Sequence, residues 1–190
     1  MKKVGMLLGL ILAASVGAFA QAQVGAKVDN FSLPDFDGKM QSLADMKGTN
    51  GVVLIFVSTQ CPVVRGYNER MNELYKAYKA KGINVVGIDS NVTEPADVVK
   101  AHAGTTWDFP VLIDKDSKIA DRFGANVTPE AYYIDANNTL LYHGAIDNDR
   151  SGRAVTERFL QTAFDSTLAG KKIERTSANA FGCSIKRTEQ

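Results

Sequence analysis

The chain has 190 residues, 45% of them hydrophobic and 23% charged, which suits one folded domain with a full core. Its 22 basic and 21 acidic side chains give a net charge of +1, which offers no electrostatic footprint for nucleic acid or an anionic membrane surface. Two cysteines and two histidines are too few for a four-thiolate zinc site or an iron–sulfur cluster, so we expect neither a metal nor another cofactor.

The first twenty residues are typical of a secretory signal peptide. Two lysines follow the initiating methionine, an apolar run extends to about Val16, and residues 18–20 fit the small-x-small rule of a cleavage site. The apolar run is shorter than the roughly 20 residues of a membrane span. We therefore expect cleavage near Ala20, no stable membrane anchor, and an exported protein, periplasmic or secreted, in which disulfides persist.

Residues 21–170 predict a single α/β domain. Asp37-Gly38 marks a hairpin turn between short strands at 31–33 and 40–43. The run from Val52 to Val57 is β-branched and apolar without alternation, as in a strand buried on both faces. The other predicted elements are a helix from Pro62 to Gly82, a strand at 83–88, a helix at 95–103, a strand at 111–113, a helix at 117–123, strands at 131–135 and 139–143, and a closing helix at 152–168.

This order predicts a mixed central sheet flanked by helices. The strand–helix–strand unit at its start favours parallel pairing, and the closely spaced strands near its end favour antiparallel pairing. Residues 171–190 have no periodicity and form a C-terminal extension that carries the second cysteine. Residues 147–152 match the opening of a calcium loop, but the twelfth position is Arg158 instead of Glu, so we interpret them as a turn that caps the last helix.

Cys61 is the candidate nucleophile. It follows a buried strand and opens a helix, where unpaired N–H groups and the helix dipole favour a thiolate. The alternative is an inert buried thiol. Arg65, one turn along, either stabilises the thiolate or is a solvated helix residue. Ser58, three residues earlier, either donates a hydrogen bond to the thiolate or its substrate, or ends the strand.

The motif order resembles a known family. A hairpin, a strand, a Cys-Pro turn, a long helix and Thr128-Pro129 before a later strand are similar to the thioredoxin-like fold, specifically the exported redoxins of the alkyl hydroperoxide reductase and thiol-specific antioxidant (AhpC/TSA, peroxiredoxin-like) family. The resemblance runs from about residue 23 to 168 and is strongest at 56–62, 67–71, 89–91 and 128–130. It implies a cis Pro129, with the backbone of Thr128 facing the redox cysteine and docking substrate; a trans proline at a strand start is the alternative.

Two departures from the family pattern bear on activity. Val64 stands where thioredoxins carry a second cysteine, so the resolving thiol must come from elsewhere. Ser58 matches the hydroxyl of peroxiredoxins, but Leu54 replaces their proline and their peroxide-site arginine has no clear match, which weakens the case for peroxidase activity.

Cys183 is the candidate resolving thiol. It follows a glycine on a tail that is long enough to return to Cys61, and loop-closure entropy grows slowly with loop length. Two alternatives are a structural disulfide that fixes the tail and a free thiol that joins another molecule.

Together these features predict an exported thiol-dependent oxidoreductase. Cys61 would attack a peroxide oxygen or a protein disulfide, Cys183 would resolve the intermediate, and an external thioredoxin-like reductant would reset the pair. Thr128 and Pro129 would dock substrate, while Ser58 and Arg65 tune the nucleophile. The alternative is a catalytically silent redoxin-fold binding module with a structural disulfide. No nucleic-acid partner is expected.

Overall fold

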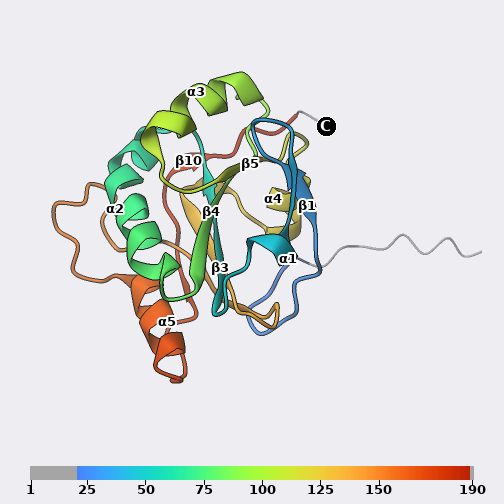
Figure 1. Cartoon of the computed structure of the whole chain (residues 1–190). Helices are drawn as coiled ribbons and strands as arrows, with labels where there is room; N and C mark the ends of the chain where they lie inside the picture. The colour runs from blue at the N-terminus through green and yellow to red at the C-terminus, as the bar shows by residue number, and fades with distance from the viewer. Residues whose placement is uncertain (1–20, 189–190) are drawn as a thin grey trace, which may run out of the picture.

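The computed structural model of the protein describes residues 21–188 (Figure 1). The expected signal peptide and its cleavage site at Ala20 lie outside the described residues. Among residues 21–188, no helix is long and apolar enough to span a bilayer.

A six-stranded sheet forms the centre of the fold. Its strands are β3 (Gly51–Val57), β4 (Ile83–Asp89), β5 (Val111–Ile113), β7 (Glu130–Ile134), β8 (Leu140–Gly144) and β9 (Ser177–Ala178). They lie in the order β5-β4-β3-β7-β8-β9. β5, β4 and β3 are parallel, whereas β7 pairs antiparallel with both β3 and β8. The predicted mixed sheet is confirmed; the edge strand β9, which is parallel to β8, was not predicted.

Helices and a hairpin cover the two faces of this sheet (Figure 1). One face carries α2 (Pro62–Lys79), α3 (Ala96–Thr106) and α5 (Phe159–Leu168); the other carries α1 (Leu43–Met46), α4 (Lys118–Phe123) and the hairpin of β1 (Ser32–Pro34) and β2 (Met40–Ser42). β3 separates the two apolar clusters, since Val53 and Ile55 face one and Leu54 and Phe56 face the other. The prediction that this strand is buried on both faces is confirmed.

Helix α2 places Cys61 at one end of the sheet. Tyr67, Met71, Leu74 and Tyr78 recur along one side of the helix and are buried against the sheet. Burying each of these large side chains contributes about 1.5–3 kcal/mol to the free energy of unfolding. The helix is therefore held in place by its apolar face, and its N-terminus stays beside the end of β3.

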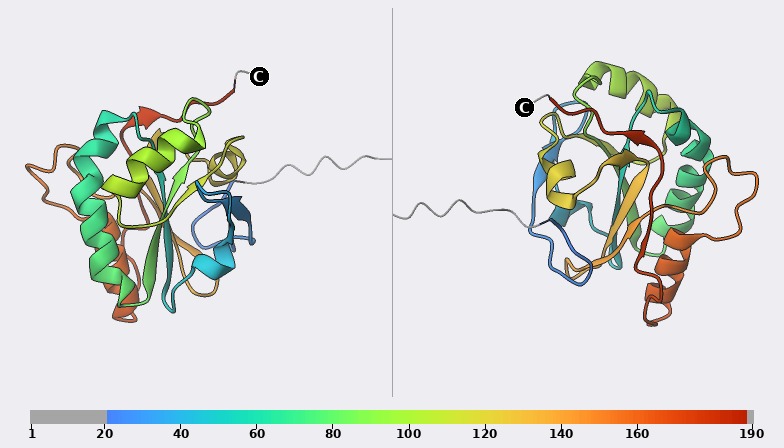
Figure 2. Two further views of the ribbon diagram at one scale, coloured as in Figure 1. Left: turned by 45° about the horizontal axis from the view of Figure 1, so that its top comes forward. Right: turned by 180° about the vertical axis from the view of Figure 1, so that it is seen from behind.

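The C-terminal tail belongs to the folded domain. It leaves α5, runs beside β8 and reaches the opposite end of the sheet (Figure 2). There β10 (Cys183–Ser184) pairs antiparallel with β6 (Val127–Thr128) in a separate two-stranded sheet. The sequence of this segment has no periodicity because its strands are too short to produce one.

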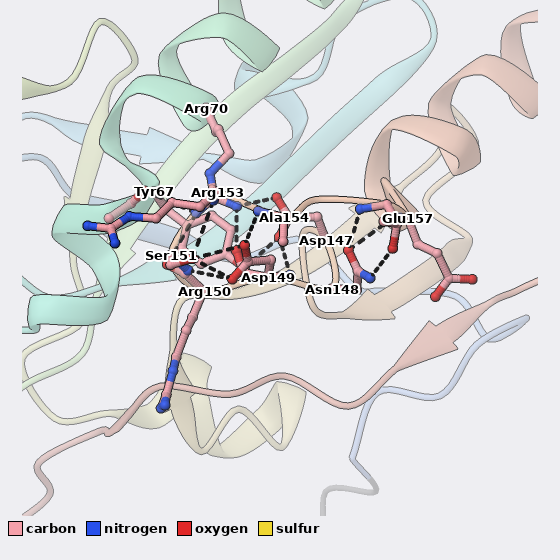
Figure 3. Close-up of polar contacts among 12 residues, drawn as sticks. Tyr67, Arg70, Asp147, Asn148, Asp149, Arg150, Ser151, Arg153, Ala154 and Glu157 are labelled. Atoms are coloured by element: carbon pink, nitrogen blue, oxygen red, sulfur yellow. Dashed lines mark hydrogen bonds and ion pairs between the residues drawn. The ribbon is translucent and has the colours of Figure 1, made fainter.

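The last helix is shorter than predicted. It begins at Phe159, so the prediction of a helix from residue 152 is wrong for the first part of that range. The Asp149 carboxylate accepts hydrogen bonds from the backbone N–H groups of Ser151 at 2.8 Å and Ala154 at 2.6 Å (Figure 3). These side-chain hydrogen bonds satisfy backbone N–H groups that a helix would otherwise satisfy, so the loop is stable without forming a helix.

The turn at residues 147–152 does not cap that helix. The residue before the helix is Arg158, and no side chain caps it. Instead, the Asp147 carboxylate pairs with Arg70 and accepts a hydrogen bond from the Tyr67 hydroxyl at 2.8 Å, both from α2 (Figure 3). The turn therefore joins the loop to α2, and its predicted capping role is wrong.

Glycine at position 144 should be required for the β8–β9 pairing. Gly144 has a φ of +126°, and a β-carbon there would lie 1.8 Å from the carbonyl oxygen of Ala178. We expect Gly144→Ala to lower the free energy of unfolding by about 1–3 kcal/mol, measured by urea denaturation. Gly104→Ala, in α3 with open space around the site, should raise it by about 0.4–1 kcal/mol. If Gly144→Ala leaves the urea midpoint unchanged, the close contact between Gly144 and Ala178 is wrong.

Candidate functional site

Cys61 lies where β3 gives way to α2. A short turn follows Val57, Cys61 occupies the position just before the first helical turn, and Pro62 is the first helical residue. Proline is tolerated there because the first N–H groups of a helix have no intrahelical partner. The Cys61 side chain is only 2% exposed, and its thiol donates a hydrogen bond to the carbonyl oxygen of Thr128 at 3.3 Å.

The loop opposite Cys61 contains the expected cis proline. The Thr128–Pro129 peptide bond is cis, which confirms that prediction. Thr128 is buried, and it ends the short strand β6 immediately before β7. Its backbone faces Cys61, as the hydrogen bond from the thiol shows.

Cys183 lies beside the same loop. In the pairing of β10 with β6, Cys183 is directly opposite Thr128. The two cysteines are free thiols, and both lie against Thr128, because Cys61 donates a hydrogen bond to its carbonyl oxygen and Cys183 is its partner across the β10–β6 pair. The fold therefore brings together two thiols that are far apart in the sequence.

The two thiols have opposite pKa shifts. Burial raises the pKa of Cys61, but the neighbouring Cys183 thiol and then the backbone N–H of Val64 outweigh burial and hold the pKa below the ordinary value. Burial and the interaction with Cys61 raise the pKa of Cys183. Cys61 is thus the thiol that ionises first, and a thiolate is the nucleophilic form.

Within the described residues, neither Ser58 nor Arg65 makes a hydrogen bond to the Cys61 sulfur. The Ser58 hydroxyl donates a hydrogen bond to the Glu94 carboxylate instead of to Cys61. The Arg65 side chain is exposed, and no hydrogen bond or ion pair of that side chain occurs within residues 21–188. Their tuning of the nucleophile stays a prediction.

Two buried acidic residues, not identified from the sequence, lie near the turn before Cys61, and one of them holds it. Glu94 is 5% exposed and accepts a hydrogen bond from the backbone N–H of Thr59 at 2.7 Å as well as from Ser58. Asp89, at the end of β4, is 2% exposed; burial, and then the charge of Glu94, raises its pKa to about 8. Glu94 thus fixes the turn that leads to Cys61, whereas Asp89 accepts hydrogen bonds from Asn91.

The sequence contains a signal for Asp89, one of these two acidic residues. β3 and β4 are parallel, so their carboxyl ends meet at one edge of the sheet, and Val57 lies opposite Asp89. An acidic residue that ends a buried apolar strand next to the cysteine-bearing strand is therefore a candidate second contributor to the site. The sequence around Glu94, by contrast, gives no indication that its carboxylate binds the Ser58 hydroxyl.

Comparison with known proteins agrees with this geometry. A protein-family model described as the AhpC/TSA family matches residues 24–143. The thiol-disulfide oxidoreductase ResA of Bacillus cereus is 36% identical over 121 residues, which cover 63% of this chain and 68% of that protein.

Solved structures share the fold. A hypothetical protein of Sinorhizobium meliloti superposes with a TM-score of 0.81 and 31% identity, covering 90% of this chain and 98% of the other. A putative thiol:disulfide interchange protein DsbE of Chlorobium tepidum superposes with a TM-score of 0.61 and 22% identity, covering 79% and 98%, and this likeness shows the fold alone. The chain has the expected thioredoxin-like fold and belongs to the AhpC/TSA family.

Proposed function

We propose that this protein is a thiol–disulfide oxidoreductase that alternates between a Cys61/Cys183 dithiol and a Cys61–Cys183 disulfide. The observation that carries the proposal is the placement of both cysteines against Thr128, Cys61 through the hydrogen bond to its carbonyl oxygen and Cys183 through the β10–β6 pairing. The pKa of Cys61 is lowered and that of Cys183 is raised, which assigns the role of nucleophile to Cys61. The name of the Bacillus cereus relative, a thiol-disulfide oxidoreductase, supports the same class of reaction.

The oxidative half of the cycle begins at Cys61. Its thiolate attacks one sulfur of a substrate disulfide, the substrate S–S bond breaks, and one substrate thiolate leaves. Cys183 then gives up its proton and attacks the Cys61 sulfur, which releases the second substrate thiolate and leaves the internal disulfide. The protein dithiol is oxidised by two electrons, and the substrate disulfide is reduced to two thiols.

An external dithiol of the thioredoxin class resets the pair. The Cys61 side chain is almost fully buried, whereas Cys183 is only partly buried, so an incoming thiolate meets the Cys183 sulfur first. Attack there releases Cys61 as the leaving thiolate, which is favoured because a thiol of lower pKa leaves faster. The second thiol of the reductant then attacks the mixed disulfide, which frees Cys183.

A peroxide is the second candidate substrate. The Thr128 hydroxyl is buried on the residue whose carbonyl oxygen meets the Cys61 thiol, and it has no hydrogen-bond partner within the described residues, so it is free to bind a peroxide oxygen. In that reaction Cys61 attacks one oxygen, the O–O bond breaks, and water or an alcohol leaves. The resulting sulfenic acid condenses with Cys183, which releases water and forms the same disulfide.

We also propose that the mature protein is exported, on the strength of the basic, apolar and small-residue pattern of residues 1–20. When the full-length chain is expressed in a bacterial host, intact-mass measurement of the periplasmic fraction should give a protein that begins at Gln21. The same chain with Ala20→Arg should keep the leader. A wild-type protein that retains Lys2 and Lys3 contradicts the proposal.

The lowered pKa of Cys61 should appear in its alkylation. The iodoacetamide reaction of Cys61, followed by peptide mass spectrometry, should reach half its maximal rate at a lower pH than that of free cysteine, since only the thiolate reacts. Cys183 should reach half its rate at a higher pH. In Cys183→Ala the pH profile of Cys61 alkylation should move to higher pH, because the largest interaction that stabilises the Cys61 thiolate is lost. An unmoved profile contradicts the assigned interaction.

Substitution of each cysteine should block the reaction at a different step. With dithiothreitol as reductant and either hydroxyethyl disulfide or hydrogen peroxide as oxidant, Cys61→Ser should lose turnover by at least about 1,000-fold because it lacks the nucleophile. Cys183→Ser should still undergo the first oxidation and accumulate a mixed disulfide or a sulfenic acid at Cys61, detected by mass spectrometry. Ser166→Ala, in α5, which carries neither cysteine, is the control. Full turnover in Cys61→Ser contradicts the proposed function, and wild-type turnover no faster than the uncatalysed reaction favours the silent binding module.

A further inference from the structure

The C-terminal tail occupies the backbone edge beside the nucleophile. β10 pairs antiparallel with β6, with Cys183 opposite Thr128 and Ser184 opposite Val127. The pairing continues beyond the strand, where the backbone N–H of Ile185 donates a hydrogen bond to the Asn126 carbonyl oxygen at 2.9 Å. The chain's own tail thus takes the hydrogen-bonding positions that run alongside Cys61.

The tail is closely seated on this edge. A β-carbon at Gly182 would lie 1.9 Å from the Thr128 carbonyl oxygen, so only glycine allows the two backbones to come this near. Ile185 is 5% exposed and packs into the apolar cluster under α4. The backbone of Lys186 then donates to the Asn91 side chain at 3.0 Å and accepts from the N–H of Val92 at 2.9 Å.

Farther along, the tail is fixed by a charged side chain. Arg187 pairs with the Asp121 carboxylate at 2.8 Å and donates to the Ala125 carbonyl oxygen at 2.6 Å. On the other side of Gly182, the ring of Phe181 lies 6.4 Å from that of Tyr67 on α2. Contacts on both sides of Cys183 therefore hold the tail in place, so β10 is not readily displaced.

An extended polypeptide needs an open strand edge in order to add itself to a sheet. At β6 that edge is already paired, and the Cys61 side chain beneath it is only 2% exposed. We infer that Cys61 reacts with low-molecular-weight disulfides, and that the tail excludes disulfides held in extended polypeptides. This inference rests on the proposed function and specifies its substrate class.

The reaction with such a substrate balances without another reactant. The Cys61 thiolate attacks one sulfur of a dialkyl disulfide, the S–S bond breaks and one alkyl thiolate leaves. Cys183 attacks the Cys61 sulfur and releases the second alkyl thiolate. The two protons lost by the protein thiols go to the two alkyl thiolates, and the two electrons come from the protein dithiol.

A comparison of two disulfides on one variant tests the inference. Cys183→Ser keeps the tail and stops the reaction at the mixed disulfide on Cys61, which intact-mass measurement follows in time. The small probe is hydroxyethyl disulfide, and the large one is a disulfide-linked dimer of a short unstructured peptide with a central cysteine. Each rate constant is divided by that of the same probe with free cysteine. We expect the normalised rate of the small probe to exceed that of the peptide by about tenfold or more, because the peptide must first displace hydrogen-bonded strand.

A second variant displaces the tail without removing it. In Gly182→Val with Cys183→Ser, the new side chain meets the Thr128 carbonyl and pushes β10 off β6. The normalised peptide rate should rise by about tenfold, while the rate of the small probe changes by less than about twofold. Ser184→Val with Cys183→Ser is the matched control, since Ser184 is exposed and its substitution leaves the close contact at Gly182 intact.

Each other outcome has a definite meaning. If Cys183→Ser takes both probes at equal normalised rates, the tail excludes nothing and the inference is wrong, while the proposed function stands. If displacing the tail raises both rates equally, the tail shields Cys61 from every oxidant and selection by size is wrong. If Cys61 reacts with neither probe in any variant, the proposed function itself is wrong. Should Gly182→Val fail to fold, the two probes on Cys183→Ser alone decide the question.

Discussion

The backbone of Thr128 meets both cysteine-bearing segments. Its carbonyl oxygen accepts the hydrogen bond of the Cys61 thiol, and the same oxygen lies against Gly182, one residue before Cys183. A buried carbonyl must have a partner, and here the partner is the nucleophile. The two-residue strand β6 thereby sets how far the thiols stand from each other, although α2 and the tail that supply them are separate elements.

The electrostatics of the two thiols set the order in which they react. Burial works against ionisation of either thiol, yet the hydrogen bonds favour charge on Cys61, so the proton stays on Cys183. A thiol that holds its proton is a poor nucleophile toward an outside substrate and a good donor to a neighbouring thiolate. Once Cys61 is oxidised, its charge is gone, and of the two causes that raise the pKa of Cys183, burial and the interaction with Cys61, only burial remains. The order of the two attacks therefore follows from where the charge lies at each stage.

Features that depend on a short stretch of sequence could be predicted well. The β-branched run of β3 and the Cys61-Pro62 helix start carry such signals, whereas the cis Pro129 is what the family resemblance implies; the structure contains all three. The start of α5 was missed because Asp149 and Asn148 satisfy the loop's N–H groups with their side chains. The contact of Glu94 with Ser58 and the pairing of β10 with β6 depend on long-range packing, which no short stretch of sequence specifies. Cys183 was named from its residue type and tail position, whereas its place opposite Thr128 required the structure.

The distance along the chain between the tail and β6 has a consequence for folding. Contacts between segments far apart in sequence form late, because the intervening chain must first become ordered. The β10–β6 pairing needs both β7, which positions β6, and α5, which returns the chain toward it. The sheet and its helices can thus be complete while Cys61 is still uncovered. A Cys61 thiol that is uncovered in that interval would be able to form a disulfide with a second copy of the chain, so slow pairing of the tail with β6 would favour dimers linked through Cys61.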